Sequence, residues 1–180
     1  MDSTRKNRAE MVLALYRLVG KPCWGITGVN TGTMASLDFG DKIPRPVRLR
    51  NPHLTPDQQQ YAGEIGLFIK EAAWRLDSRA SVICGSLSSN HEGGPKHTGL
   101  SKLLGRRVTR VKVAHPGLDV TIGFEGGLRL QVFCDRTNTT DESDNYSVHL
   151  ADRVYSVRTL SQIECLDLQN PRPLPIEPML

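Results

Sequence analysis

Residues 120–132 read VTIGFEGGLRLQV, and this stretch indicates the fold more clearly than any other. Apolar residues alternate with polar or small residues on both sides of Glu125-Gly126-Gly127, which is the period-2 pattern of two half-buried strands. The two glycines can adopt the positive φ angles that a tight hairpin turn requires. The stretch therefore predicts an antiparallel β-hairpin.

Both strands of this hairpin have counterparts earlier in the chain. Residues 103–124 match residues 18–39 at an offset of 85, in a Leu-x-Gly segment and in three alternating apolar positions. The second strand, 128–132, matches residues 65–69 at an offset of 63. We therefore predict two tandem copies of one antiparallel strand motif, the first of which carries 22 additional residues.

The additional residues form a predicted loop insertion, 41–62. Its four prolines exclude regular structure for much of its length. Two interpretations compete over residues 55–76, because Thr55-Pro56 is typical of a helix start and apolar residues follow at helical spacing. Gly63 and Gly66 would weaken such a helix, and the match to 128–132 favours a strand over residues 64–70. We favour the strand.

The remaining segments complete a β-dominated α+β class, in which the two copies form one sheet or sandwich. An N-terminal helix is predicted over residues 8–19, where apolar residues at helical spacing end at Gly20. Further strands and connections are assigned by their residue types. These are strands over 80–84, 144–150 and 154–157, a polar loop over 137–144, and a flexible linker, 86–99, between the first copy (20–85) and the second copy (100–160). Residues 1–167 form one domain, and 168–180 form an extended Pro-rich tail.

Composition restricts the class of protein. Hydrophobic residues make up 38% and charged residues 23% of the chain, as in a folded globular domain. No apolar run approaches the roughly 18 residues of a membrane span, and the N-terminus is a poor signal peptide, so we expect a cytoplasmic protein without a membrane partner. The four cysteines stand singly, with no C-x-x-C pair, which indicates reduced and mostly buried thiols rather than a zinc site.

No residue pattern in the sequence specifies a reaction. The G-x-S-x-G elbow of serine hydrolases is missing, and the glycine-rich stretch 25–32 lacks the lysine of a phosphate-binding loop and reads better as a hairpin or bulged strand. Among the five histidines only His91 and His97 are close in sequence, and they fall in the predicted linker. We expect no catalytic residues, no metal and no cofactor, and therefore no enzymatic activity.

Basic residues are the most suggestive feature for binding. Five cations fall within eleven residues that contain no acid, and a second group of three lies in the insertion. The predicted binding residues are Lys102, Arg106, Arg107, Arg110, Lys112, Arg45, Arg48 and Arg50. On a strand, Arg106, Arg110 and Lys112 would share one face and could contact phosphates. Charges that prevent strand edges from aggregating give the same pattern, so both interpretations stay open.

Short motifs carry a resemblance to a known family. They are Gly20-x-x-x-Trp24-Gly25, Leu37-x-Phe39-Gly40, Gly63-Glu64 and Ala73-Trp74-Arg75-Leu76. The chain resembles a family of small uncharacterised bacterial β-rich proteins with this pattern, similar to immunity and accessory proteins of toxin or defence systems. The duplicated β-scaffold, the long insertion and the lack of a reaction centre predict a non-catalytic module of this kind. We expect it to bind a protein, namely a toxin or defence subunit encoded next to it, through a sheet face or the 41–62 insertion. Nucleic-acid binding through residues 102–112 is the alternative, and an enzyme of unrecognised type is the third.

Overall fold

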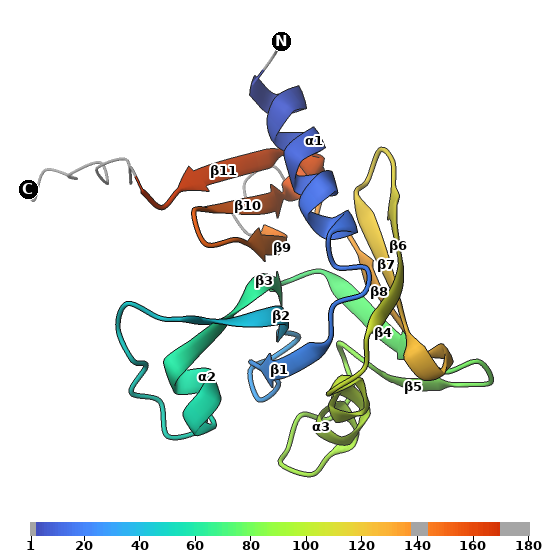
Figure 1. Ribbon diagram of the computed structural model, residues 1–180. Coiled ribbons are helices and arrows are strands. Elements are labelled where there is room, and N and C mark those ends of the chain that lie inside the picture. The colour runs from blue at the N-terminus through green and yellow to red at the C-terminus, as the bar shows by residue number, and fades with distance from the viewer. Residues whose placement is uncertain (1–2, 138–143, 170–180) are drawn as a thin grey trace, which may run out of the picture.

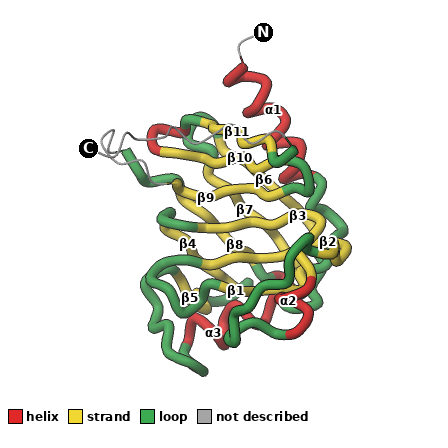
Figure 2. The backbone as a smooth tube through the Cα atoms, turned by 90° about the vertical axis from the view of Figure 1, so that its left-hand side faces the viewer, coloured by secondary structure: helices red, strands yellow, loops and turns green. Residues whose placement is uncertain are grey.

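The computed structural model describes residues 3–137 and 144–169. In this part of the chain, two antiparallel sheets face each other across one hydrophobic core (Figures 1 and 2). The six-stranded sheet has the order β1 (Cys23–Thr27), β2 (Ala35–Pro44), β3 (Tyr61–Ile69), β9 (Asp144–His149), β10 (Arg153–Arg158) and β11 (Ile163–Asp167). The five-stranded sheet has the order β5 (Val82–Gly85), β4 (Ala73–Asp77), β8 (Arg129–Phe133), β7 (Asp119–Phe124) and β6 (Val108–Ala114). The predicted β-dominated α+β class is confirmed.

The register of the strands reproduces the offsets read from the sequence. Ile26 pairs with Leu37 between β1 and β2, and the residues 85 positions later, Val111 and Ile122, pair between β6 and β7. The third strands, β3 and β8, pair with the second strands at positions related by the offset of 63. A β-bulge also recurs at the start of β1 and of β6. The chain therefore contains two copies of one motif.

The two copies exchange their last strands. β4 and β5 belong to the first copy but extend the sheet of the second, while β9 and β10 extend the sheet of the first. The opening segments also pair symmetrically, because the amide of Gly20 donates to Val108 O and the amide of Gly105 donates to Cys23 O, both at 2.7 Å. Neither copy completes its own sheet, so the two copies share one core.

The helices differ from the predicted ranges. α1 (Ser3–Tyr16) starts and ends earlier than the predicted 8–19, and it is followed by a turn that ends at Gly20, whose φ is +85°. The prediction of a flexible linker over 86–99 is wrong at its C-terminal end, where α3 (Pro95–Leu100) begins and is followed by the 3-10 helix η1 (Ser101–Leu103). Gly99 lets α3 lie against β5, because a Cβ there would collide with the Cys84 sulfur. At the offset of 85, α3 corresponds in sequence to residues 10–15 at the end of α1.

Residues 55–76 contain both a helix and strands. Thr55 caps α2 (Pro56–Gln60) with a reciprocal capping box, but this helix ends after five residues. The strand favoured over 64–70 is confirmed as β3, and Gly63 lets it approach β2, since a Cβ there would lie 2.7 Å from the Phe39 nitrogen. β2 ends at Pro44 and β3 begins at Tyr61, so the irregular part of the insertion is shorter than 41–62.

The other predicted strands correspond to β5, β9 and β10, whereas β4 and β11 were not expected from the sequence. The predicted tail 168–180 lies outside the described residues except for 168 and 169, and so does most of the polar loop 137–144. All four cysteines are free thiols; Cys23 and Cys84 are buried, and Cys134 and Cys165 are partly buried. None of the helices in the described ranges is long and apolar enough to cross a membrane.

Candidate functional site

The outer face of the five-stranded sheet gathers cations. Along β4, β6 and β8, four side chains that point away from the core are arginine or lysine, and all four are exposed. Two further arginines lie at the end of the sheet, beside the turn between β7 and β8. This surface, called the basic face below, consists of Arg75, Arg79, Arg106, Arg110, Lys112 and Arg129.

Strand pairing arranges the basic face in rows that run across the sheet. The first row consists of Arg110, Gly123, Arg129 and Asp77. The second row consists of Lys112, Thr121, Gln131 and Arg75. Neighbouring strands lie about 4.8 Å apart, and successive outward residues of one strand lie about 6.8 Å apart. The four cations of the two rows are therefore within reach of one extended ligand.

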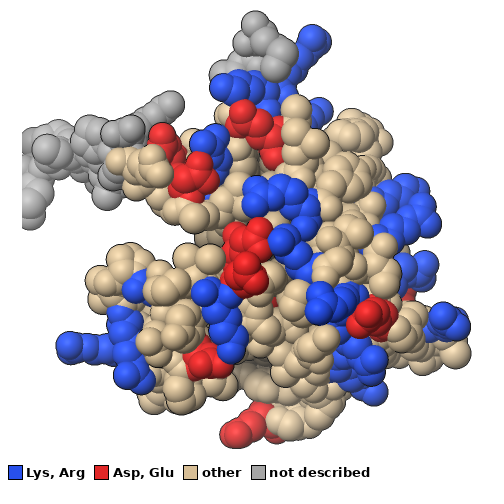
Figure 3. All heavy atoms as spheres, in the orientation of Figure 1, with Lys and Arg blue, Asp and Glu red and all other residues tan. Residues whose placement is uncertain are grey.

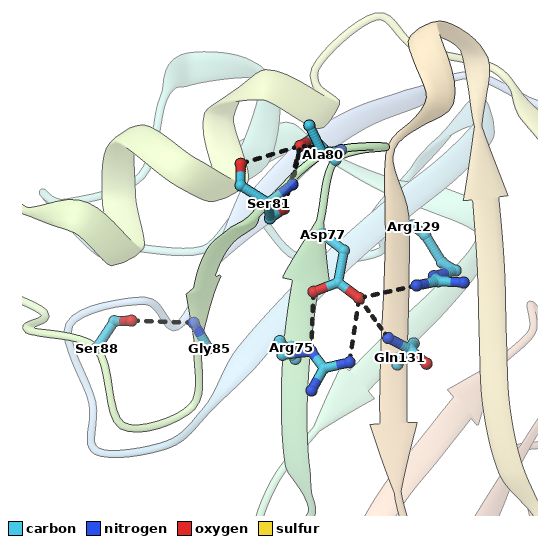
Figure 4. A network of polar contacts seen from close by, with 9 residues as sticks. Arg75, Asp77, Ala80, Ser81, Gly85, Ser88, Arg129 and Gln131 are labelled. Atoms are coloured by element: carbon cyan, nitrogen blue, oxygen red, sulfur yellow. Dashed lines mark hydrogen bonds and ion pairs between the residues drawn. The ribbon is translucent and has the colours of Figure 1, made fainter.

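Asp77 organises the centre of the basic face (Figure 4). Its Oδ1 accepts a hydrogen bond from Arg75 Nε at 2.8 Å, and its Oδ2 accepts from Gln131 Nε2 at 2.6 Å and from Arg129 Nη2 at 3.2 Å. Burial acts to raise the pKa of this carboxyl, but hydrogen bonds and charge from the two guanidinium groups outweigh burial and lower the pKa below its ordinary value. The ionised carboxylate holds both arginines in place and leaves about half of each side chain exposed to solvent.

The turn between β7 and β8 holds the other two arginines. Gly126 and Gly127 both have φ of +78°, a conformation that favours glycine. A Cβ at Gly127 would lie 2.7 Å from Arg79 Cγ, so only glycine lets this side chain lie against the turn. A Cβ at Gly126 would lie 3.6 Å from Arg106 Nη1. The turn thus brings together two cations that are separated by 27 positions in the sequence.

The structure divides the predicted cluster 102–112. Arg106, Arg110 and Lys112 belong to the basic face and form no ion pair with the residues that the structure describes. Lys102 lies in η1 beside α3, away from the sheet face. Arg107 turns to the edge of the sheet, where its Nη1 donates to the carbonyl of Gly20 at 2.8 Å.

The second predicted group does not join the first. Arg45, Arg48 and Arg50 lie in the loop between β2 and α2, at the left of Figure 1, whereas β6 is at the right. Arg45 Nε donates to the carbonyl of Tyr61 at 2.9 Å, and Arg48 Nη2 donates to Gln59 Oε1 at 2.7 Å. These two arginines brace the insertion.

Sequence reasoning missed half of the basic face. Arg75 and Arg129 come from β4 and β8, and Arg79 comes from the turn between β4 and β5. The signal for Arg129 was present, because it occupies a polar position of the alternating stretch 128–132. No sequence signal placed β4 next to β8. Figure 3 shows Lys and Arg side chains along the right-hand margin of the molecule, where β6 lies in Figure 1.

A second surface feature is a cleft of about 490 Å³ between the insertion, the β1–β2 turn and the α3 region. Trp24 lines it, together with polar side chains that include Asn30, Gln58 and His97. His97 is hydrogen-bonded to Asn30, and Lys42 lies 5.2 Å from the centroid of the Trp24 ring. In the second copy a tight turn connects β7 and β8, so no insertion lines a corresponding cleft between those strands.

The arrangement nearest to a catalytic pair is Ser147 with His149 on β9. Ser147 Oγ lies 2.8 Å from His149 Nε2, and burial together with the Arg45 charge lowers the pKa of the imidazole. No carboxylate among the described residues hydrogen-bonds to His149, so the group that would orient a catalytic base is not provided there. The described ranges also hold no cluster of three His, Cys, Asp or Glu side chains suited to a metal ion.

Comparisons with protein-family models, with curated proteins and with solved structures found no match. The resemblance to small bacterial immunity and accessory proteins therefore stays a prediction.

Proposed function

We propose that the chain is a non-catalytic binding module that holds nucleic acid on the basic face. The supporting observation is that cations from separate segments of both copies meet on one exposed sheet surface. Asp77 is the only carboxylate in the first and second rows of this surface. Nucleic acid presents regularly spaced phosphates, and each phosphate that is neutralised by lysine or arginine releases counterions. A sheet with several cations in register can gain this contribution several times.

Protection of a sheet edge explains only part of the pattern. Arg110 and Lys112 lie on β6, which is an edge strand, and charges there discourage pairing with another chain. Arg129 lies on β8, however, at the centre of the sheet, and Arg75 lies on β4, one strand from the other edge. Edge protection provides no reason for cations at these two positions. Both arginines pair with Asp77, but about half of each side chain stays exposed and can also meet an anion.

The held arginines suit phosphate recognition. A guanidinium presents its donors in a planar fork, which matches phosphate oxygens better than a lysine ammonium does. Asp77 engages Arg75 through Nε and one terminal nitrogen, and it engages Arg129 through one terminal nitrogen. The remaining N–H groups of both arginines are left for a ligand, and less side-chain entropy is lost on binding because the network already orders them.

Fluorescence anisotropy with a labelled single-stranded oligonucleotide of about 16 nucleotides tests the proposal. If four cations of the basic face engage phosphates, affinity should fall with salt at a log–log slope of about −3. Replacing Arg110 and Lys112 together by alanine should reduce the slope to about −1.5, because two phosphate contacts are lost.

A matched control removes the same charge at the same spacing elsewhere. Arg48→Ala with Arg50→Ala eliminates two cations from the insertion and should leave the slope near that of the parent protein. Binding that is insensitive to salt, or equal losses from both double variants, would exclude the basic face as the site. Equally tight binding of poly-glutamate would identify an acidic protein as the ligand in place of nucleic acid.

A second function, binding of a protein partner, is supported by the insertion. This segment is ordered by Arg45, Arg48 and the Thr55 cap, yet it exposes 74% of Val47 and 40% of Leu49 to solvent. The two side chains line one shallow hollow of the insertion, and apolar side chains that gather on one exposed surface can mark an interaction site. The expected partner, a toxin or defence subunit encoded next to this chain, stays a prediction.

Co-expression with the products of the neighbouring genes, followed by size-exclusion chromatography, tests this second function. Val47→Asp with Leu49→Asp should abolish a complex formed through the insertion. Leu87→Asp is the control, because Leu87 is 92% exposed but lies in the loop after β5. If no neighbouring product co-elutes, or if a complex survives the double substitution, the insertion is not a docking surface.

A further inference from the structure

The sheet surface that carries the basic face also exposes one aromatic side chain. Phe133 is the last residue of β8, on the same face as Arg129 and Gln131, and 37% of it is exposed. Its partner across the sheet on β4 is the small residue Ala73, so no large side chain shields the ring from that side. Its ring stacks on no other aromatic ring in the part of the chain that the structure describes.

Phe133 begins a third row on the basic face. The register of β7 and β8 places Asp119 opposite Phe133, because Val120 pairs with Val132. Asp119 Oδ1 accepts a hydrogen bond from the amide of Cys134 at 2.7 Å, which ties the carboxylate to the residue that follows Phe133. The first two rows are thus cationic, and the third row combines an aromatic ring with a carboxylate.

This polarity suits a nucleotide chain lying in one direction. Phosphates are attracted to the first two rows and repelled from Asp119. A base can stack on an aromatic ring whatever its identity, and a carboxylate can accept a hydrogen bond from the amino group of a base. The distance between rows, about 6.8 Å, lets a single nucleotide place its phosphate near Arg75 and its base near Phe133.

We infer that the basic face binds single-stranded nucleic acid, with phosphates on the rows of Arg110 and Lys112 and an unpaired base stacked on Phe133. This inference rests on the proposed function and makes it more specific. In a duplex the bases are stacked within the helix and only phosphates face a flat surface, so Phe133 contributes to the binding of single strands and not of duplexes.

The test compares Phe133→Ala, Phe133→Leu and Phe133→Tyr with the parent protein. Anisotropy is measured with one labelled strand of about 16 nucleotides and with the same strand annealed to its complement. Phe133→Ala and Phe133→Leu should weaken single-strand binding roughly tenfold and leave duplex binding unchanged. Phe133→Tyr should retain single-strand affinity, because it retains a ring. Tyr16→Ala, which removes an exposed aromatic from α1, should change neither.

The outcomes separate this inference from the proposal on which it rests. If neither nucleic acid binds, both are wrong. If both bind with a strong salt dependence but Phe133→Ala and Phe133→Leu leave single-strand affinity unchanged, or weaken single strands and duplexes equally, the basic face binds phosphates and the stacking inference is overturned. The leucine variant keeps most of the apolar volume, so a loss shared by both variants is due to the missing ring and not to unfolding.

Discussion

Asp77→Asn removes the charge at the centre of the basic face and changes little else in shape. Asp77 is 4% exposed, and its carboxylate accepts hydrogen bonds from Arg75, Arg129 and Gln131. An asparagine keeps one acceptor oxygen, but its amino group would point donors at the donors of an arginine. The substitution therefore loses the ionic part of the network and leaves buried donors without acceptors.

The loss of stability in this variant depends on which of the unpaired groups can be hydrated by water. Hydrogen bonds to a charged group contribute about 1.5–3 kcal/mol each when their loss leaves buried groups unpaired. The Arg75 and Arg129 side chains are 46% and 54% exposed, so water replaces much of what they lose. We therefore expect a net loss of about 2 kcal/mol in the free energy of unfolding. For a chain of this size, that corresponds to a melting temperature lower by about 4–8 °C.

The dependence on pH gives the sharper test. The folded-state pKa of Asp77 lies below the value of about 3.9 expected in the unfolded chain. A carboxyl with a lowered pKa stabilises the fold fully above its unfolded pKa, and this contribution is lost as the pH falls through its folded pKa. Urea and thermal denaturation should therefore show the full difference between parent and variant at pH 7. The difference should shrink progressively below about pH 4.

Asp57→Asn is the control, because Asp57 forms an exposed pair with Lys42 at 2.5 Å. Exposed pairs contribute about 0–1 kcal/mol, so this variant should unfold nearly like the parent. A cost of less than about 0.5 kcal/mol for Asp77→Asn at pH 7, or a cost that stays constant down to about pH 3, would contradict this role of Asp77.

Three further outcomes are expected. Asp77→Asn should bind single-stranded oligonucleotide more tightly than the parent at low salt, because removing the one carboxylate from the two cationic rows outweighs the ordering of Arg75 and Arg129 that is lost with it. Weaker binding measured by anisotropy would contradict this. Gly63→Ala should lower the free energy of unfolding in urea by about 1–3 kcal/mol, because its Cβ would lie 2.7 Å from the Phe39 nitrogen. Gly117→Ala, whose Cβ would have its nearest contact at 3.6 Å, should be nearly neutral. Burial raises the pKa of the Cys23 and Cys134 thiols to about 12, so iodoacetamide should label them at pH 8 only after unfolding. Rapid labelling of either thiol in the native protein, detected by mass spectrometry, would contradict this expectation.

Part of the candidate site could be predicted because it is local. Arg110 and Lys112 stand two positions apart in a strand-like stretch, and the alternation of a strand places such residues on one face wherever the strand lies. Lys102 and Arg107 belong to the same run of cations but not to the face, because the chain turns at Gly105, where φ is +77°, and bulges at the start of β6. A count of charges in the sequence cannot reveal that turn.

Period-2 alternation and two constant offsets, both visible in the sequence, predicted β2, β3, β7 and β8 and the position of the insertion. Which strands lie next to one another is visible only in the folded chain. β4 pairs with β8 of the other copy, and this exchange carries Arg75 to Arg129 and places Asp77 between them. Alternation and turn formation depend on residues that are near in sequence, so they can be predicted from it. Pairing of β4 with β8 joins segments about 50 residues apart through backbone groups that every residue shares, so no side-chain pattern reveals it.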